Sequence, residues 1–237
     1  MSRGVDVDAI CLSPGVDVDA LRESVSELLS VDGYQPLASI GEVLLEPMME
    51  WCLPSERCVT VTEIFASDGG NWQIVYDTQF STAQLADALS REFPDQRIIQ
   101  FNLQEEVDLT LRVLHGDGAI FEYSNAPSYF NWGRCLGRSE AERLARIDIP
   151  AFIEALGRMA NAEMIKGNFA TVAAKTLGTR KGPKGKHSGG VYDAMQAIAS
   201  EAGLPRLYRF FEGWMKSDLD WDEDNVAAVF AFRKTGL

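Results

Sequence analysis

The chain has 237 residues, of which 46% are hydrophobic and 24% charged, the composition of an ordinary folded globular protein. No stretch approaches the roughly 18 consecutive apolar residues that a membrane helix requires, and residues 1–8 lack the cationic and apolar parts of a secretory signal. We therefore expect a cytoplasmic protein without membrane contact, built as one large domain or as two smaller ones.

The net charge of −13 and the isoelectric point near 4.6 make the protein acidic. Such a charge repels nucleic acid and anionic membranes, and it attracts basic partners. Solubility alone is the simpler explanation, because many soluble proteins are acidic. We expect a protein partner with a basic surface, and nucleic acid is the less favoured partner.

The cations are unevenly distributed along the chain. No acidic residue lies between Glu163 and Asp193, and residues 178–190 have the glycine-rich composition of a mobile loop. This loop differs from a Walker A motif, because Arg180 stands where a glycine is needed and His187 where Ser or Thr is needed. A phosphate or nucleic-acid contact and a solvated linker are the two interpretations. The candidate anion ligands are Arg180, Lys181, Lys184 and Lys186.

The first predicted elements are a strand over residues 5–12 and a helix that begins at Asp17 or Asp19 and ends at Gly33. Residues 37–53 fit either a broken helix or a short strand followed by a turn. The helix is amphipathic, because its apolar residues recur at helical spacing: Leu21, Val25, Leu28 and Leu29.

A central run of two strands, a helix and three strands follows. The first two strands form a hairpin around the turn residues 67–70, with alternating side chains from Cys58 to Phe65 and from Trp72 to Tyr76. Ser81 and Gln84 form a capping box at the start of the helix, which stops at Pro94.

The last three strands of the run cover residues 97–103, 107–114 and 119–123, with a tight turn from His115 to Gly118. In the middle strand, polar side chains alternate with apolar ones, so we expect one side of the sheet to be partly solvated. These polar residues are Asp108, Thr110 and Arg112.

The C-terminal part is predicted to be mainly helical. Helices are expected from Ser139, from Asp148 to Gly157, over residues 160–177, and through Tyr192 to Gly203. Two further segments, 207–214 and 226–232, are predicted to be strands that pair with each other.

These patterns predict an α+β protein with a mostly antiparallel sheet and helices packed on one face. Residues 1–160 would form an α+β domain that contains the central run. Residues 161–237 would form a C-terminal α+β segment, either separate or packed into the same domain.

Metal binding is not expected. The residues Asp218, Asp220 and Asp222 have the spacing of the first EF-hand ligands, but Glu223 replaces the required glycine and Val229 the required glutamate. The cysteines form no Cys-x-x-Cys pair, and two histidines cannot complete a usual zinc set with them. We interpret them as ordinary thiols: Cys11, Cys52, Cys58 and Cys135.

No catalytic residues are predicted. The chain contains no nucleophile elbow, zincin motif or dinucleotide-binding glycine pattern. His115 falls in a predicted turn and His187 in the basic loop, which are poor places to hold a general base. We expect a protein without enzymatic activity or cofactor, and a hydrolase with an unrecognised site is the alternative.

The end of the central run carries the best candidate recognition surface. Tyrosine and tryptophan offer a large contact area at low entropic cost and are enriched in binding hot spots. The alternative is that these rings cover the sheet and are buried against the following helix. The candidate partner-binding residues are Tyr123, Asn125, Tyr129, Phe130 and Trp132.

Residues 72–132 also resemble a known type of domain. The resemblance lies in the order of Trp72–Tyr76, Leu85–Ser90, Ile98–Phe101, Leu111–Leu114, Gly116–Gly118, Glu122–Asn125 and Pro127–Phe130. This order is similar to a small α+β domain of uncharacterised bacterial proteins, some of which look like immunity proteins of toxin systems. The resemblance implies a binding role without catalytic residues. The resulting hypothesis is an immunity protein that masks a basic toxin surface.

Overall fold

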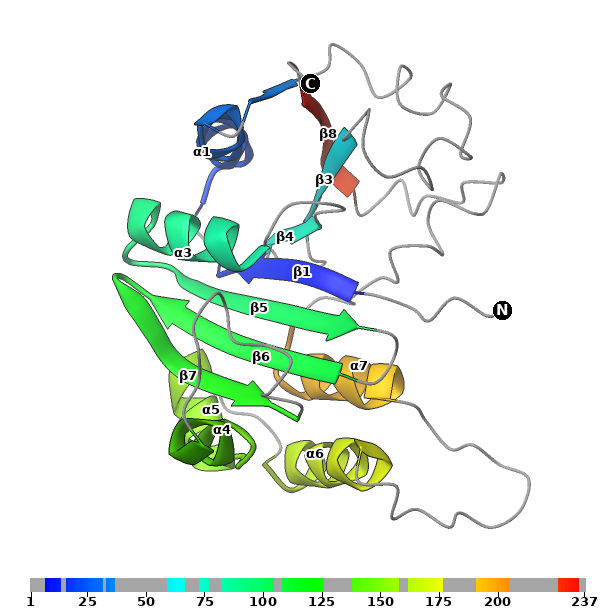
Figure 1. Cartoon of the computed structure of the whole chain (residues 1–237). Coiled ribbons are helices and arrows are strands. Elements are labelled where there is room, and N and C mark those ends of the chain that lie inside the picture. Colours follow the sequence, from blue (N-terminus) through cyan, green and yellow to red (C-terminus); the bar gives the residue numbers. More distant parts are fainter. Residues whose placement is uncertain are drawn as a thin grey trace, which may run out of the picture.

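The strands that the computed structural model describes form one sheet (Figure 1). The structure describes residues 7–13, 16–31, 33–36, 59–66, 73–76, 82–104, 108–125, 138–157, 162–176, 191–204 and 226–234. The sheet has eight strands in the order β2-β8-β3-β4-β1-β5-β6-β7, and each pair of neighbours is antiparallel. The predicted α+β class with an antiparallel sheet is therefore confirmed.

The described elements lie close to the predicted ones, except for a short strand at residues 34–36 that was not predicted. The strands are β1 (Val7–Leu12), β2 (Tyr34–Pro36), β3 (Val59–Ala66), β4 (Gln73–Tyr76), β5 (Arg97–Gln104), β6 (Asp108–His115), β7 (Gly118–Ser124) and β8 (Val226–Lys234). The helices are α1 (Val18–Val31), α3 (Thr82–Glu92), α4 (Arg138–Leu144), α5 (Ile149–Leu156), α6 (Ala162–Thr176) and α7 (Val191–Glu201).

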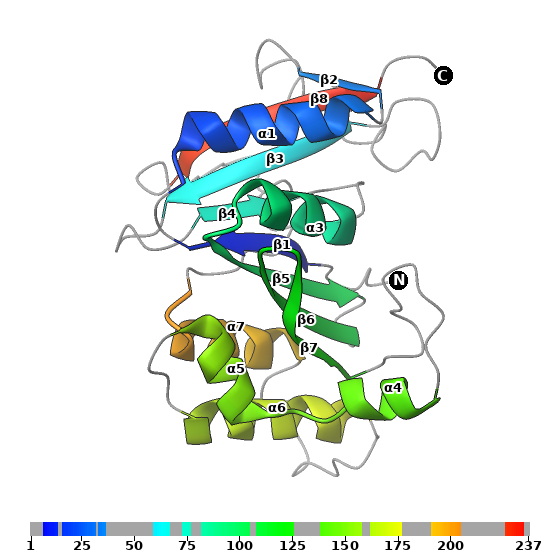
Figure 2. The same ribbon diagram turned by 90° about the vertical axis from the view of Figure 1, so that its left-hand side faces the viewer.

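Helices pack on both faces of the sheet, which corrects the prediction of helices on one face. In β1, the successive side chains of Ile10 and Cys11 point to opposite faces, yet both are fully buried. Ile98 and Ile99 in β5 show the same behaviour. Helices α1 and α3 lie beside each other on one face (Figure 2), and α5, α6 and α7 cover the other.

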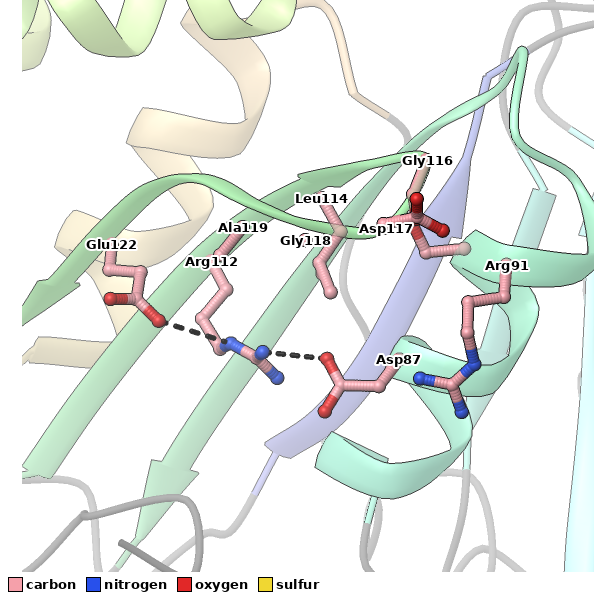
Figure 3. A pocket seen from close by; sticks show the side chains of 10 residues that line it. Asp87, Arg91, Arg112, Leu114, Gly116, Asp117, Gly118, Ala119 and Glu122 are labelled. Atoms are coloured by element: carbon pink, nitrogen blue, oxygen red, sulfur yellow. Dashed lines mark hydrogen bonds and ion pairs between the residues drawn. The ribbon is translucent and has the colours of Figure 1, made fainter.

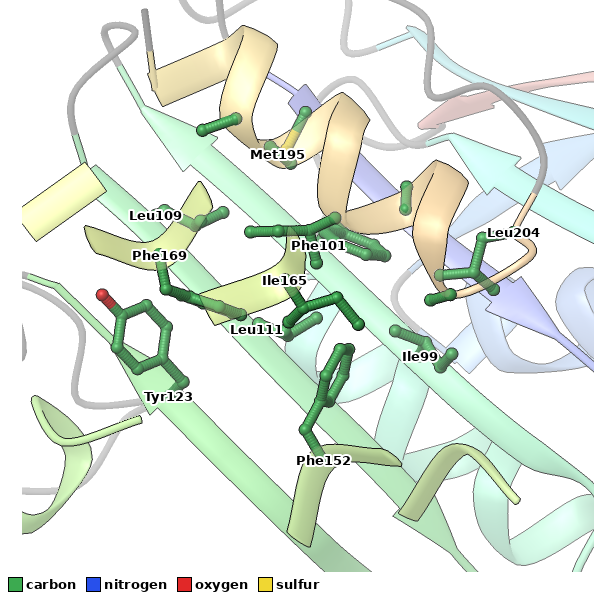
Figure 4. Packing of buried hydrophobic residues seen from close by; sticks show 14 of the residues in the cluster. Ile99, Phe101, Leu109, Leu111, Tyr123, Phe152, Ile165, Phe169, Met195 and Leu204 are labelled. Carbon is green, nitrogen blue, oxygen red and sulfur yellow. The ribbon is translucent and has the colours of Figure 1, made fainter. Parts of the chain in front are cut away.

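The larger core lies between strands β5–β7 and helices α5–α7 (Figure 4). Phe152 of α5 packs on Phe121 of β7 with a ring-centroid distance of 5.0 Å. Phe169 of α6 meets Phe152 edge-to-face at 6.3 Å. Together with the buried Phe101 and Met195, these rings join the C-terminal helices to the central run.

The smaller core lies on the opposite face, under α1 and α3. The predicted amphipathic stripe of α1 is buried here, and Leu85 and Leu89 of α3 complete the layer against the sheet. The strand residues of this core are Ile10, Leu12, Tyr34, Ile98 and Leu114.

The polar side of β6 is buried, although its alternation predicted partial solvation. Thr110 is 1% exposed and Arg112 is 6% exposed. Helix α3 packs against β5 and β6 on this face, and Asp87 of α3 contacts Arg112 directly. The alternation of polar and apolar residues in β6 therefore separates two buried faces. One face is an apolar core, and the other is partly polar and is covered by α3.

Strand β8 completes the other half of the sheet. It pairs with β3 from Val59 to Phe65 and with the short β2, so the predicted C-terminal strand is present. Its predicted partner, residues 207–214, lies outside the described residues. Together with α6 and α7, β8 places C-terminal elements in the same sheet and core as elements from residues 1–160.

Short-range signals set the ends of the helices. Asp17 Oδ1 accepts hydrogen bonds from the amides of Asp19 and Ala20 at the start of α1, at 2.9 and 3.2 Å. At α5, Asp148 accepts from the Ala151 amide at 3.0 Å, and Gly157 ends the helix with φ of +64°.

Two glycine substitutions are expected to change stability in opposite directions. G157A should lower the free energy of unfolding by about 1–2 kcal/mol, because alanine disfavours a positive φ. Its added Cβ would also lie 2.7 Å from Cζ of Arg97. G167A should raise the free energy of unfolding by roughly 0.5–1 kcal/mol, because Gly167 is helical and its Cβ would meet nothing within 4 Å. Urea denaturation checks both, and equal stabilities would contradict the assignment of Gly157 as the helix cap.

Candidate functional site

A polar hollow of about 340 Å³ lies between α3 and the β6–β7 hairpin (Figure 3). Strand β6 forms its floor, the C-terminal half of α3 one wall, and the hairpin with β7 the other. Its size falls within the range of roughly 300–1,000 Å³ typical of ligand pockets. The lining residues are Asp87, Ser90, Arg91, Arg112, Leu114, Gly116, Asp117, Gly118, Ala119 and Glu122.

The hollow exists because the hairpin wall is made of small residues. Gly116 has φ of +60°, which allows the tight turn, and Gly118 and Ala119 start β7 with little side-chain volume. The hydroxyl of Ser90 donates to the Gly116 carbonyl at 2.8 Å and joins the end of α3 to the turn. This hydrogen bond holds the two walls at a fixed separation.

Arg112 is the central charge at the floor. Its guanidinium donates to Asp87 Oδ1 from Nη2 at 2.7 Å and to Gln100 Oε1 from Nη1 at 3.1 Å. Its Nε lies 3.8 Å from Glu122 Oε1. Because a buried charge is costly unless it is paired and hydrogen-bonded, two carboxylates and an amide around one arginine form a stable arrangement.

Glu122 also extends this network to the edge of the sheet. Its Oε2 accepts from Nη2 of Arg143 in α4 at 3.4 Å, while its other oxygen faces Arg112. A chain of alternating charges thus runs from Asp87 in α3 through β6 and β7 to α4. Ligand contacts in the hollow would act directly on this chain.

The charged groups of the hollow differ in their access to solvent. The side chain of Arg112 is 7% exposed, whereas that of Asp87 is 39% exposed. Asp117 and Arg91 are exposed at the rim. The lining holds three carboxylates and two guanidinium groups, and a ligand entering from solvent meets Asp87, Asp117 and Arg91 before Arg112.

The chemistry of the hollow comes mainly from its carboxylates, which can bind a ligand or act as a general acid or base. Among the described lining residues there is no histidine or cysteine to act as a base or thiol nucleophile. The hydroxyl of Ser90 is already engaged with a backbone carbonyl. The lining supplies charge and hydrogen bonds that can orient a ligand, and the small apolar surface of Ala119 can contact a hydrocarbon segment.

Tyr123 is a core residue, which corrects its predicted place on a recognition surface. It is 2% exposed and meets Phe169 edge-to-face, with ring centroids 4.6 Å apart. Asn125 is half-buried and connects the ends of β6 and β7. Its side-chain Oδ1 accepts a hydrogen bond from the Leu109 backbone amide at 2.7 Å, and its backbone amide donates to the Leu109 carbonyl. Both residues stabilise the scaffold.

The remaining predicted ligands lie outside the described residues. They are the partner-binding candidates Tyr129, Phe130 and Trp132, the anion-binding candidates Arg180, Lys181, Lys184 and Lys186, and the aspartates of the acidic segment, Asp218, Asp220 and Asp222.

Within the described ranges, no three His, Cys, Asp or Glu side chains come together as a metal site. Cys11 is buried, and burial raises the pKa of its thiol. No helix in the part of the chain that the structure describes has the length and apolar character needed to cross a membrane.

The residues of the hollow were not selected by sequence reasoning. Arg112 appeared only as one polar residue of an alternating strand, and Asp87 as one position of a helix. The one available signal was an arginine placed between the apolar residues of a central strand, where burial requires a carboxylate partner. The identity of that partner depends on tertiary packing.

Comparison with known proteins adds no relative. The chain matches no family model, no curated protein and no solved structure.

Tyr123→Phe is expected to change the pH dependence of stability. Burial raises the pKa of Tyr123 to about 12, above its ordinary value of 10. The stabilising contribution of the neutral hydroxyl is therefore complete below pH 10 and is lost as the pH rises toward 12. The unfolding free energy of Y123F, measured by denaturation from pH 7 to 12, should fall less steeply than that of the wild type, by on the order of 2 kcal/mol. Parallel curves would show that Tyr123 titrates normally.

Proposed function

We propose that the protein binds another protein with a basic surface, through the face of the sheet that α1 and α3 cover. The supporting observation is the charge of this face. Among the described residues of this face, the exposed cations are Arg22 and Arg91. The exposed carboxylates described there are Asp17, Asp19, Glu23, Glu27, Glu92, Asp95 and Asp117.

These carboxylates come from three neighbouring elements. Helices α1 and α3 contact each other, and Ser90 connects α3 to the β6–β7 turn that carries Asp117. Complementary charge across an interface accelerates association and selects partners. The acidic surface therefore extends over both helices and the hairpin.

In its finer form, the proposal is an immunity protein that neutralises a basic toxin by masking its surface. The acidic charge of −13 and the resemblance of residues 72–132 to immunity-like domains support this form. The aromatic residues Tyr129, Phe130 and Trp132 remain candidates for additional contacts, whereas Tyr123 does not.

The double substitution E23Q/E27Q tests the acidic face. Both residues are exposed on α1, so the change removes two charges without removing packing. A partner captured on the immobilised wild-type protein at low salt is identified by mass spectrometry, and its affinity is measured by calorimetry. We expect E23Q/E27Q to weaken binding roughly 3- to 30-fold, since each lost charge contact at an interface rim is worth up to about 1 kcal/mol.

The matched control is E154Q/E163Q, which removes two exposed helical glutamates from α5 and α6 on the other face of the sheet. Its affinity should equal that of the wild type. Equal losses for the two variants would indicate a general effect of net charge and would contradict a specific acidic face. If co-expression fails to relieve toxicity of the captured partner, the immunity form of the proposal is wrong while the binding role stands.

A further inference from the structure

The hollow between α3 and the β6–β7 hairpin has a net acidic lining at its accessible level. Arg112 cannot readily serve an incoming anion, because Asp87, Gln100 and Glu122 already surround its guanidinium. Asp87 is far more exposed than Arg112, at 39% against 7% for the side chains. A ligand that enters the hollow therefore meets the carboxylate side of this ion pair.

The rim carries one charge of each sign. Asp117 projects from the hairpin turn and Arg91 from α3, and the two residues line opposite walls (Figure 3). Since Asp117 offsets Arg91 and Arg112 offsets one of Asp87 and Glu122, the lining carries one excess negative charge, and Arg143 lies beside Glu122 outside the hollow. The surrounding face adds Glu92 and Asp95 at the end of α3. This field favours a cationic group over an anionic one.

The apolar part of the lining is small and suits a narrow ligand. Ala119 forms its exposed part on the hairpin wall, with Gly116 and Gly118 beside it, whereas Leu114 is fully buried beneath the floor. Lysine and arginine combine a hydrocarbon stem that packs on apolar surface with a charged head that binds a carboxylate. A stem on Ala119 would place its head near Asp87 and Asp117.

We propose that this hollow accepts a lysine or arginine side chain of the partner protein, with the cationic head held by Asp87 and Asp117 and the stem against the exposed Ala119. This inference rests on the proposed function, because it takes the ligand from a basic protein surface. It adds the location of an anchoring contact, which the broad acidic face alone does not define. Anchors of this kind occupy pockets near the centre of protein interfaces and carry much of the binding energy.

The test uses acetyl-arginine amide as the probe and acetyl-citrulline amide as its uncharged isostere. Backbone amide shifts of the full chain are followed by NMR during titration with each compound. We expect saturable shifts at Ser90, Arg91, Gly116 and Gly118 with the arginine compound and none with the citrulline compound. D117N should weaken this binding several-fold, because it removes the rim carboxylate.

The matched control is D95N, which removes an exposed aspartate at the end of α3 that does not line the hollow. It should bind the arginine compound as the wild type does. If the arginine compound shifts only the backbone amides of Glu23 and Glu27 in α1, the inference is overturned and the proposed function stands. Shifts at the hollow caused by inorganic phosphate and not by arginine would overturn it in favour of an anion site at Arg91. A protein that binds neither the arginine compound nor any basic protein would contradict both proposals.

Discussion

Replacing Arg112 with methionine is expected to lower the free energy of unfolding by about 3 kcal/mol, one of the two largest effects predicted for this protein. The substitution keeps much of the side-chain volume but removes the charge that balances Asp87 and Glu122. Glu122 is only 12% exposed, so its carboxylate would lose a close cation in a place with little water. The remaining contact to Arg143, at 3.4 Å, offsets part of this loss.

A second substitution separates charge from packing at this position. Adding E122Q to R112M removes the carboxylate that the first change leaves without Arg112, so the double variant should be more stable than R112M. Denaturation by urea, followed by fluorescence and circular dichroism, measures all three proteins. If R112M proves as stable as the wild type, the network makes no net contribution to folding stability.

Replacing Phe152 with alanine is expected to cost about 3–5 kcal/mol, because it opens a cavity in the larger core. Phe152 is fully buried and packs on the rings of Phe121 and Phe169. Its loss should weaken the attachment of α5 and α6 to β7. Thermal denaturation would show a midpoint lowered by several degrees or an unfolded protein at room temperature.

The conservative variant F152L serves as the control for this prediction. Leucine refills most of the volume, so the loss of stability should be clearly smaller than for alanine. Because Phe152 lies on the face opposite α1 and α3, a folded F152L protein should bind its basic partner with unchanged affinity. Equal stability of F152A and the wild type would mean that the C-terminal helices contribute little to the core.

The sequence predicted the local elements well, because local elements follow from short-range chemistry. Asp17 and Asp148 cap helices, and the turn at Gly116 joins two strands, since each needs only neighbouring residues to form. The placement of helices on both faces was missed. It depends on β1 lying between β4 and β5, and on the burial of both Ile98 and Ile99, which alternation rules for a half-solvated sheet do not indicate.

The candidate site could not be predicted for the same reason. Asp87, Arg112 and Glu122 come from a helix and two strands, and only the packing of α3 on β6 brings them together. Read along the chain, Arg112 looks like a residue on a solvated strand face, because a buried ion pair and an exposed arginine give the same alternation. The aromatic residue Tyr123 gave the opposite error, since a ring suited to recognition is equally suited to a core.

The position of β8 has a consequence for how the protein is made. On the ribosome, residues of β2 and β3 emerge early, yet the strand that lies between them is synthesised only after residue 226. Strands β1, β5, β6 and β7 can pair while translation continues. The edge of β3 that pairs with β8 stays unpaired until β8 is synthesised. Nascent chains should therefore pass through a stage in which the strands from β3 to β7 in sheet order are paired and the outer edge of β3 is available to chaperones or to aggregation.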